Sequence, residues 1–138
     1  LRVHARPATA IRVAACLHQQ PTVKRLYYPG LEGDPGHNVA RKQYHGGFGA
    51  MVSFEIDSDV QGAQRFVEST RLFQLAVSLG AVESLIEVPA VMSHGAYAPE
   101  ARRAVGIKDG LIRLSVGLEE AGDLENDLLQ AMDSLSAS

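Results

Sequence analysis

The chain contains 138 residues, of which 46% are hydrophobic and 21% are charged, and its formal net charge is −3. This size and composition predict one soluble domain with a single sizeable core, and no apolar run approaches the roughly 18 residues of a membrane-spanning helix. The weakly acidic balance and an aromatic content of 6% argue against nucleic-acid binding, which needs a basic surface and stacking side chains.

The first predicted helix begins at Leu1 and ends at residues 19–21, where Gln-Gln-Pro is a stop signal. Pro7 either starts the main helix at its first position or kinks a longer one. Cys16 is the single cysteine and is expected to be a buried structural thiol, which fits a reducing compartment. With no signal peptide visible, we expect a cytoplasmic protein. The apolar positions of this helix are Ala8, Ile11, Ala15 and Leu17.

Two strands and a short helix are predicted in the next part of the chain. Residues 23–28 are typical of a strand, residues 31–37 of a loop, and residues 38–44 of a short helix. Residues 48–56 alternate apolar and small or polar side chains, which predicts a second strand with one buried face.

Asp59 is expected to cap the following helix. Residues 75–79 and 84–88 are predicted as two short extended segments. Pro99 can open a short helix through Ala104, which Gly106 closes. The apolar stripe of the helix after Asp59 is Val60, Ala63, Val67 and Thr70, with Phe66 beside it.

Residues 111–118 form the last predicted strand, and a final helix begins near Asp123. No repeat, low-complexity tract or linker interrupts the chain, so residues 1–138 are expected to form one domain. Interspersed strands and helices predict an α+β fold, a small mostly antiparallel sheet with helices packed on one face. The stripe of the final helix is Leu124, Leu128, Met132 and Leu135, which places Met132 in the core.

Arg113 is a lone cation within the apolar run of the last strand. Alternation places Ile112 and Leu114 on one face and Arg113 with Ser115 on the other. A guanidinium on a stiff strand presents a planar fork of donors that suits a carboxylate or a phosphate. A solvated strand face or a structural salt bridge is the alternative that this segment leaves open.

Four segments, in this order and spacing, resemble one enzyme family. They are VKRLYYPGL at residues 23–31, GGFGAMVSFE at 46–55, SLGAVESLIEVPAVMSH at 78–94 and GIKDGLIRLSVGLE at 106–119. The chain is similar to the Cys/Met-metabolism enzymes that use pyridoxal phosphate (PLP), a family that contains cystathionine γ-synthase, cystathionine γ- and β-lyases, methionine γ-lyase and homoserine-ester sulfhydrylases.

The resemblance implies that the chain is the C-terminal substrate-recognition domain of a fold-type I PLP enzyme. The PLP-binding large domain would lie upstream, as the start on Leu1 without an initiator Met also suggests. The implied reaction cleaves or forms a C–S bond, as in cystathionine γ-lyase or γ-synthase, with a methionine γ-lyase or homoserine-ester sulfhydrylase type as the alternative. The implied substrate is an amino-acid thioether or a homoserine ester, and the implied assembly is a homotetramer.

PLP chemistry needs a lysine that holds the cofactor, an acid at its ring nitrogen and donors for its phosphate. Family enzymes carry this lysine in a Ser-x-Thr-Lys-like motif upstream of the segment that this chain resembles. Lys24, Lys42 and Lys108 are the only lysines, and none matches that motif. We therefore expect no catalytic residue in this chain, and no activity from it alone.

The substrate-binding residues follow from the resemblance, position by position. Arg113 matches the arginine that binds the substrate's α-carboxylate. Ser78 and Leu79 match positions that line the same pocket, although Ser78 alone is also typical of a turn before Gly80. Ser93 replaces the family's usual threonine and keeps its hydroxyl.

Val77 leaves the substrate unresolved. Some family members have a glutamate here that can hold a distal ammonium, whereas valine favours a shorter or more apolar side chain or merely packs. No histidine pair has metal-ligand spacing, so no metal is expected. The rival class is a non-catalytic binding or assembly module that kept the sheet and lost the chemistry.

Overall fold

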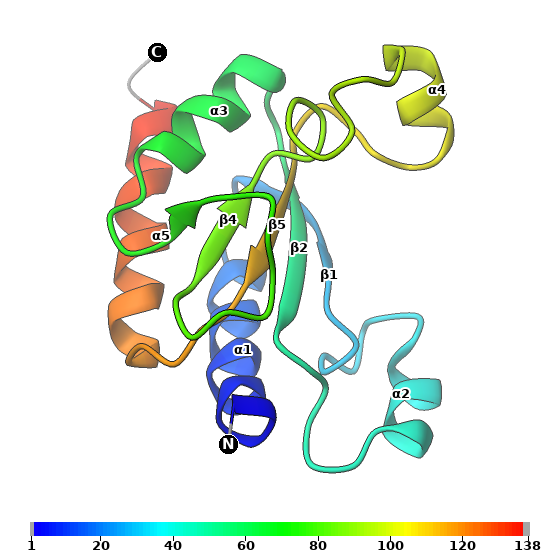
Figure 1. Ribbon diagram of the computed structural model, residues 1–138, viewed down its shortest axis with the longest axis vertical. Helices are drawn as coiled ribbons and strands as arrows, with labels where there is room; N and C mark the ends of the chain where they lie inside the picture. The colour runs from blue at the N-terminus through cyan, green and yellow to red at the C-terminus, as the bar shows by residue number, and fades with distance from the viewer. Residues whose placement is uncertain (1, 137–138) are drawn as a thin grey trace.

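The computed structural model describes residues 2–136, which form a five-stranded sheet and five helices (Figure 1). The strands are β1 (Val23–Tyr27), β2 (Met51–Ile56), β3 (Gln74–Leu75), β4 (Leu85–Glu87) and β5 (Leu111–Ser115). The helices are α1 (Arg2–His18), α2 (His37–Gln43), α3 (Val60–Glu68), α4 (Pro99–Ala104) and α5 (Ala121–Ser136). None of these helices has the length and apolar content needed to cross a membrane.

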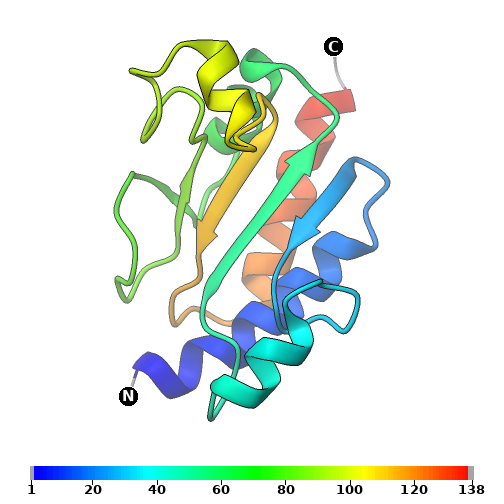
Figure 2. The ribbon, with the colours of Figure 1, turned by 90° about the vertical axis from the view of Figure 1, so that its right-hand side faces the viewer.

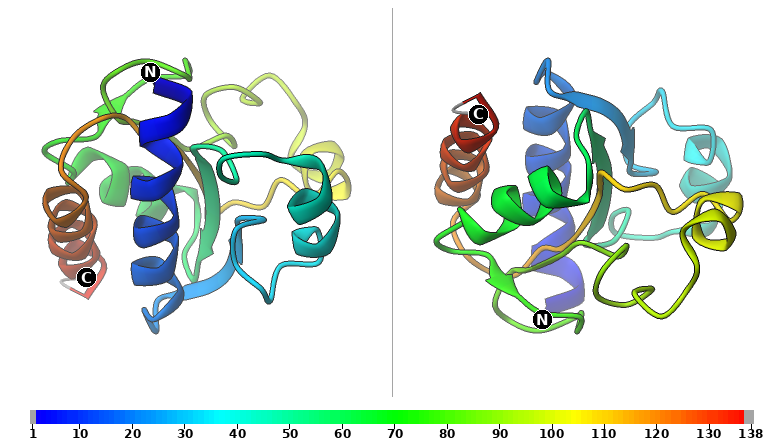
Figure 3. Two further views of the ribbon diagram at one scale, coloured as in Figure 1. Left: turned by 90° about the horizontal axis from the view of Figure 1, so that it is seen from below. Right: turned by 90° about the horizontal axis from the view of Figure 1, so that it is seen from above.

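The strand order is β1-β2-β5-β4-β3, which Figure 2 shows face-on for the longer strands. Every neighbouring pair is antiparallel except β3 and β4, which are parallel. Helices α1, α3 and α5 cover one face, while the short helices α2 and α4 lie on the other side (Figure 3). The predicted α+β class and mostly antiparallel sheet are confirmed, with the three long helices on one face.

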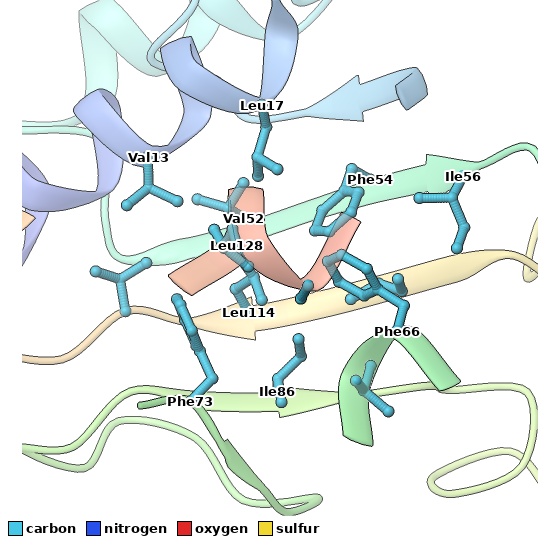
Figure 4. Close-up of a cluster of buried hydrophobic side chains, with 14 of the residues drawn as sticks. Val13, Leu17, Val52, Phe54, Ile56, Phe66, Phe73, Ile86, Leu114 and Leu128 are labelled. Atoms are coloured by element: carbon cyan, nitrogen blue, oxygen red, sulfur yellow. The ribbon is translucent and has the colours of Figure 1, made fainter. Parts of the chain in front are cut away.

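The core lies between the sheet and the three long helices (Figure 4). Phe54 of β2 meets Phe66 of α3 edge to face, with ring centroids 5.9 Å apart and planes at 85°. This geometry aligns the positive ring edge with the negative ring face. Alternate residues of the strands point into the same core, as predicted for β2 and β5: Val52, Phe54, Ile56, Ile112 and Leu114 are all buried.

The predicted apolar stripe of α1 is confirmed at Leu17 and wrong at its other three positions. Ala8, Ile11 and Ala15 are exposed, and the helix instead packs the face that contains Val13 and Leu17, both with no exposed surface. The alanines of α1 lie on several of its sides, so the sequence alone offers two overlapping apolar stripes. Tertiary packing decides between them, and the face that meets the core contains Ala10, Val13, Ala14 and Leu17, which have no exposed surface.

Pro7 lies inside α1, so the helix continues through it rather than starting there. The predicted start at Leu1 lies outside the described residues. Cys16 is partly rather than fully buried, and burial together with the nearby Glu125 raises the pKa of its thiol.

The observed strands are shorter than the predicted ones. β2 begins at Met51 because Gly47 and Gly49 adopt positive φ values of 130° and 83°, which a regular strand does not accommodate. Of the predicted extended segment 75–79, only Leu75 belongs to a strand. Leu118 follows the end of β5 and is 43% exposed, so the predicted strand 111–118 extends beyond the observed one.

Candidate functional site

The sheet face opposite the three long helices is polar. Registers pair Arg113 with Ser53 of β2 on one side and with Glu87 of β4 on the other. Because side chains alternate along each strand, these residues share one face. We call it the polar face after its polar residues, which are Arg25, Tyr27, Ser53, Glu55, Glu87, Arg113 and Ser115. The same registers place the apolar Met51, Leu85 and Leu111 on this face as well.

Arg113 lies at the centre of this face and its side chain is 24% exposed. Its NH1 group forms an ion pair with Glu87 Oε1 at 3.0 Å. Its NH2 group donates to the carbonyl oxygens of Val77 at 2.6 Å and Ser78 at 3.4 Å. The guanidinium is therefore held from the sheet by a carboxylate and from the loop by main-chain oxygens, which fixes its plane.

The loop formed by residues 76–84, which we call the clamp loop, is tied to the sheet at several points. Gly80 N–H donates to Ser115 Oγ at 2.9 Å, and Leu118 N–H donates to Val82 O at 2.8 Å. From α1, Arg6 NH1 donates to Ala81 O at 3.1 Å. These bonds hold an irregular segment in place where regular secondary structure is absent.

Ser84 closes the base of the clamp loop and has no exposed surface. Its N–H and its hydroxyl donate to the Glu119 carboxylate at 2.7 and 2.8 Å. Its hydroxyl oxygen also accepts from Gly117 N–H at 2.8 Å. A Cβ on Gly117 would lie 2.4 Å from Val82 O, so glycine is required for this close approach.

Ser93 joins the same cluster from the segment after β4. Its hydroxyl donates to Glu87 Oε1 at 3.2 Å and lies 2.9 Å from His94 Nδ1. Glu87 is only 1% exposed. Its second oxygen, Oε2, is buried and has no hydrogen-bond partner among residues 2–136.

Of the predicted site residues, Val77 and Ser78 thus contact Arg113 directly through their main-chain oxygens. Ser93 is linked to Arg113 indirectly, because both bond to Glu87. The side chains of Val77 and Leu79 are 50% and 58% exposed on the clamp loop. Ser78 is also exposed, and only its carbonyl contacts the guanidinium.

Sequence reasoning assigned no role to Glu87 or Ser115. A signal for Glu87 was present, because it stands alone between the apolar Ile86 and Val88, as Arg113 does between its own apolar neighbours. Two lone opposite charges in adjacent strands are expected to pair, since each is costly to bury alone. The residues around Ser115 gave no such signal, because serine is common on solvated strand faces.

A second cluster occupies the edge of the polar face. Glu55 accepts from Lys108 Nζ at 2.8 Å and from the hydroxyl of Tyr27. Burial acts to raise the pKa of Glu55, but the hydrogen bonds from Lys108 and Tyr27 outweigh it and the net pKa is lowered. Burial and the bond to Glu55 raise the pKa of Tyr27. The Glu55 carboxylate, the Lys108 ammonium and the Tyr27 hydroxyl are thus engaged in bonds within this cluster.

The lysines do not fit the role of holding PLP. Lys24 is paired with Asp57 at 3.0 Å and Lys108 with Glu55 at 2.8 Å, and both lysines are more than half exposed. Lys42 is exposed on α2. In the described part of the chain, no group of three or more His, Cys, Asp or Glu residues is placed to hold a metal ion. Among these residues, Arg113 has the planar donor geometry that suits a carboxylate.

Comparisons with known proteins agree on one family. Residues 1–133 match the family described as Cys/Met metabolism PLP-dependent enzyme. Cystathionine beta-lyase of Lactococcus lactis subsp. cremoris (strain MG1363) is 50% identical over 133 residues, which are 96% of this chain and 34% of the relative.

Two solved structures share the fold over almost the whole chain. Cystathionine gamma-lyase from yeast has a TM-score of 0.92 and 43% identity, covering 98% of this chain and 35% of its own. Cystathionine gamma synthase from Xanthomonas oryzae pv. oryzae, solved in complex with cystathionine, has a TM-score of 0.90 and 45% identity, covering 99% and 35%. The chain therefore spans about a third of the length of these relatives.

Proposed function

Because the chain belongs to the Cys/Met metabolism PLP-dependent enzyme family, we propose that residues 1–138 are the C-terminal substrate-recognition domain of an enzyme that cleaves or forms a C–S bond in sulfur amino-acid metabolism. Pyridoxal phosphate is the cofactor of this family. The cystathionine γ-lyase or γ-synthase type is the reaction that we favour, and relatives of both types support it.

The role of this domain is to bind the α-carboxylate of the amino-acid substrate through Arg113. The observation that carries this proposal is the guanidinium at the centre of the polar face, held by Glu87 and by Val77 O and still 24% exposed. The contacts to Glu87, Val77 and Ser78 use only the terminal NH1 and NH2 groups, and a guanidinium has five N–H donors, so the fork keeps capacity for a carboxylate. A carboxylate fixed there would orient the substrate's reactive carbons.

The clamp loop is proposed to line the rest of the substrate pocket with Val77, Ser78 and Leu79, and Ser93 to line it from the opposite side. The two apolar side chains are half exposed in this chain, which leaves them available to contact a ligand. Because Val77 brings no charge, a methionine γ-lyase or homoserine-ester sulfhydrylase type is the second candidate.

PLP itself is proposed to bind to a large domain upstream of this chain. The occupied lysines support this, as does the share of the relatives that this chain spans. We further propose a homotetramer in the cytoplasm. The exposed apolar side chains of Val39 in α2 and of Tyr44 directly after it support burial against further protein.

Kinetics of the full polypeptide that contains this chain test the carboxylate role. Arg113→Ala is expected to raise KM for cystathionine, with a loss of about 2–5 kcal/mol, because one partner of a close charge pair is removed. Arg113→Lys should also be poor, since an ammonium lacks the planar fork. Arg65→Ala on the exposed end of α3 is the matched control and should behave as the parent.

Visible absorbance of bound PLP, measured for every variant, separates lost substrate binding from lost cofactor. Retained absorbance with raised KM supports the proposal, whereas unchanged kinetics in both Arg113 variants would remove the assigned role. The alternative function, a non-catalytic binding or assembly module, has its own test. If PLP gives no absorbance with the full polypeptide, the chain is a binding or assembly module instead.

A further inference from the structure

Glu87 is the most buried charged side chain at the candidate site, at 1% exposure. Among the residues that the structure describes, Arg113 is its only cationic partner, at 3.0 Å. A buried carboxylate is costly unless it is paired and hydrogen-bonded. Here Oε1 accepts from Ser93, while Oε2 has no hydrogen-bond partner within residues 2–136. Such a costly arrangement needs a compensating role.

The register of the sheet shows what the carboxylate does to Arg113. Glu87 and Arg113 lie directly opposite on antiparallel strands, so their side chains start from neighbouring positions on the polar face. Glu87 on the neighbouring strand forms an ion pair with NH1, and the carbonyl oxygen of Val77 in the clamp loop accepts from NH2. With both terminal nitrogens anchored, the long arginine side chain has little freedom to turn its fork away.

We propose that Glu87 is the positioning residue of the carboxylate-binding arginine, an inference that rests on the function proposed above. Glu87 acts through Arg113 and touches neither substrate nor cofactor. Its charge also offsets that of the guanidinium. Recognition then depends on hydrogen-bond geometry at the fork more than on net positive charge, and a ligand that is merely anionic gains little from this site.

Glu87→Gln in the full polypeptide tests this role, because it keeps the shape and removes the charge. We expect kcat/KM for cystathionine to fall about tenfold or more, as for the loss of one charge-assisted hydrogen bond. PLP absorbance should be retained. Glu68→Gln, exposed at the end of α3 and without an ion pair among the described residues, is the matched control and should keep the parent value.

The double variant Glu87→Gln/Arg113→Ala separates positioning from general structural support. Arg113→Ala alone leaves Glu87 buried and unpaired, so adding Glu87→Gln should raise the urea midpoint of unfolding again. If Glu87 acts only through Arg113, the same addition should change kcat/KM less than twofold. We therefore expect the double variant to have a higher urea midpoint than Arg113→Ala and almost the same kcat/KM.

Two outcomes would overturn this inference: a full tenfold additional loss in the double variant, or parent-like kcat/KM in Glu87→Gln. If Arg113→Ala lowers kcat/KM in the same series, the proposed function stands and only the role of Glu87 fails. If Arg113→Ala has no effect, the carboxylate role of Arg113 fails first, and the positioning role fails with it.

Discussion

Asp127 of α5 connects the final helix to the turn after α3, and its replacement by asparagine should destabilise the domain. Its side chain is buried, at 5% exposure. Oδ1 accepts from Arg71 N–H at 2.8 Å, and Oδ2 accepts from Leu72 N–H at 2.8 Å and Phe73 N–H at 3.2 Å. One carboxylate thereby satisfies three consecutive amides and holds Phe73 in the core.

The cost of Asp127→Asn follows from this geometry. The amide group has one oxygen, so its NH2 must face either Arg71 N–H or the pair at Leu72 and Phe73. Each buried donor left without an acceptor costs about 1–3 kcal/mol, and the remaining bonds lose their charge assistance. We expect the free energy of unfolding to fall by about 2–4 kcal/mol, a large part of the stability of a domain.

Urea unfolding followed by far-ultraviolet circular dichroism at neutral pH measures this difference. Asp133→Asn, on the exposed face of the same helix, is the control and should lie within about 0.5 kcal/mol of the parent. Equal stability of the Asp127 and Asp133 variants would refute the reasoning. A changed slope with urea would instead show that the unfolded or native state had changed in compactness.

Two further predictions concern Gly117 and Tyr28. Gly117→Ala would place a Cβ 2.4 Å from Val82 O and should lower the free energy of unfolding by about 1–3 kcal/mol or more. In Gly122→Ala of α5 the new Cβ meets nothing within 4 Å, and the free energy of unfolding should rise by about 0.5–1 kcal/mol. Equal urea midpoints for the two variants would contradict this. Burial raises the pKa of Tyr28 to about 12, so the folded state keeps a proton that the unfolded state loses near pH 10, and stability present below that pH should be lost as pH rises toward 12. Tyr28→Phe loses the bond from the hydroxyl to Gly49 O, at 3.0 Å, but its stability should decline less between about pH 9 and pH 11, with the raised pKa of Tyr27 accounting for what remains. An equal decline in both proteins, measured by unfolding at these two pH values, would contradict the assignment.

Elements with strong local signals were predictable from sequence. Asp59 caps α3 as expected, with its Oδ1 accepting from Gly62 N–H at 2.8 Å. The alternation in β2 and β5 was enough to place Phe54 and Leu114 in the core, because a strand with one buried face has period two. The position of Arg113 on the opposite face follows from the same rule.

The failures share one physical cause, which is that tertiary contacts decide between locally equal choices. The face that α1 buries depends on where the sheet offers space for Val13, and no periodicity in an alanine-rich helix reveals that. The clamp loop is irregular because its amides bond to Ser115 and Glu119, which lie more than thirty residues away. Local sequence cannot specify partners at such a distance.

The pairing of Glu87 with Arg113 joins these two lessons. Each residue is a single charge in an apolar strand, and period two puts both on the polar face, but only the sheet order β5-β4 makes them neighbours. A stiff central strand limits where the guanidinium can go, and a buried acid on the next strand limits how it can turn. An irregular loop then supplies main-chain oxygens, which in regular strands would instead accept hydrogen bonds from the neighbouring strand. The regular part of the fold thus fixes the position of the carboxylate-binding group, and the part that sequence predicts least well, residues 76–84, completes its orientation.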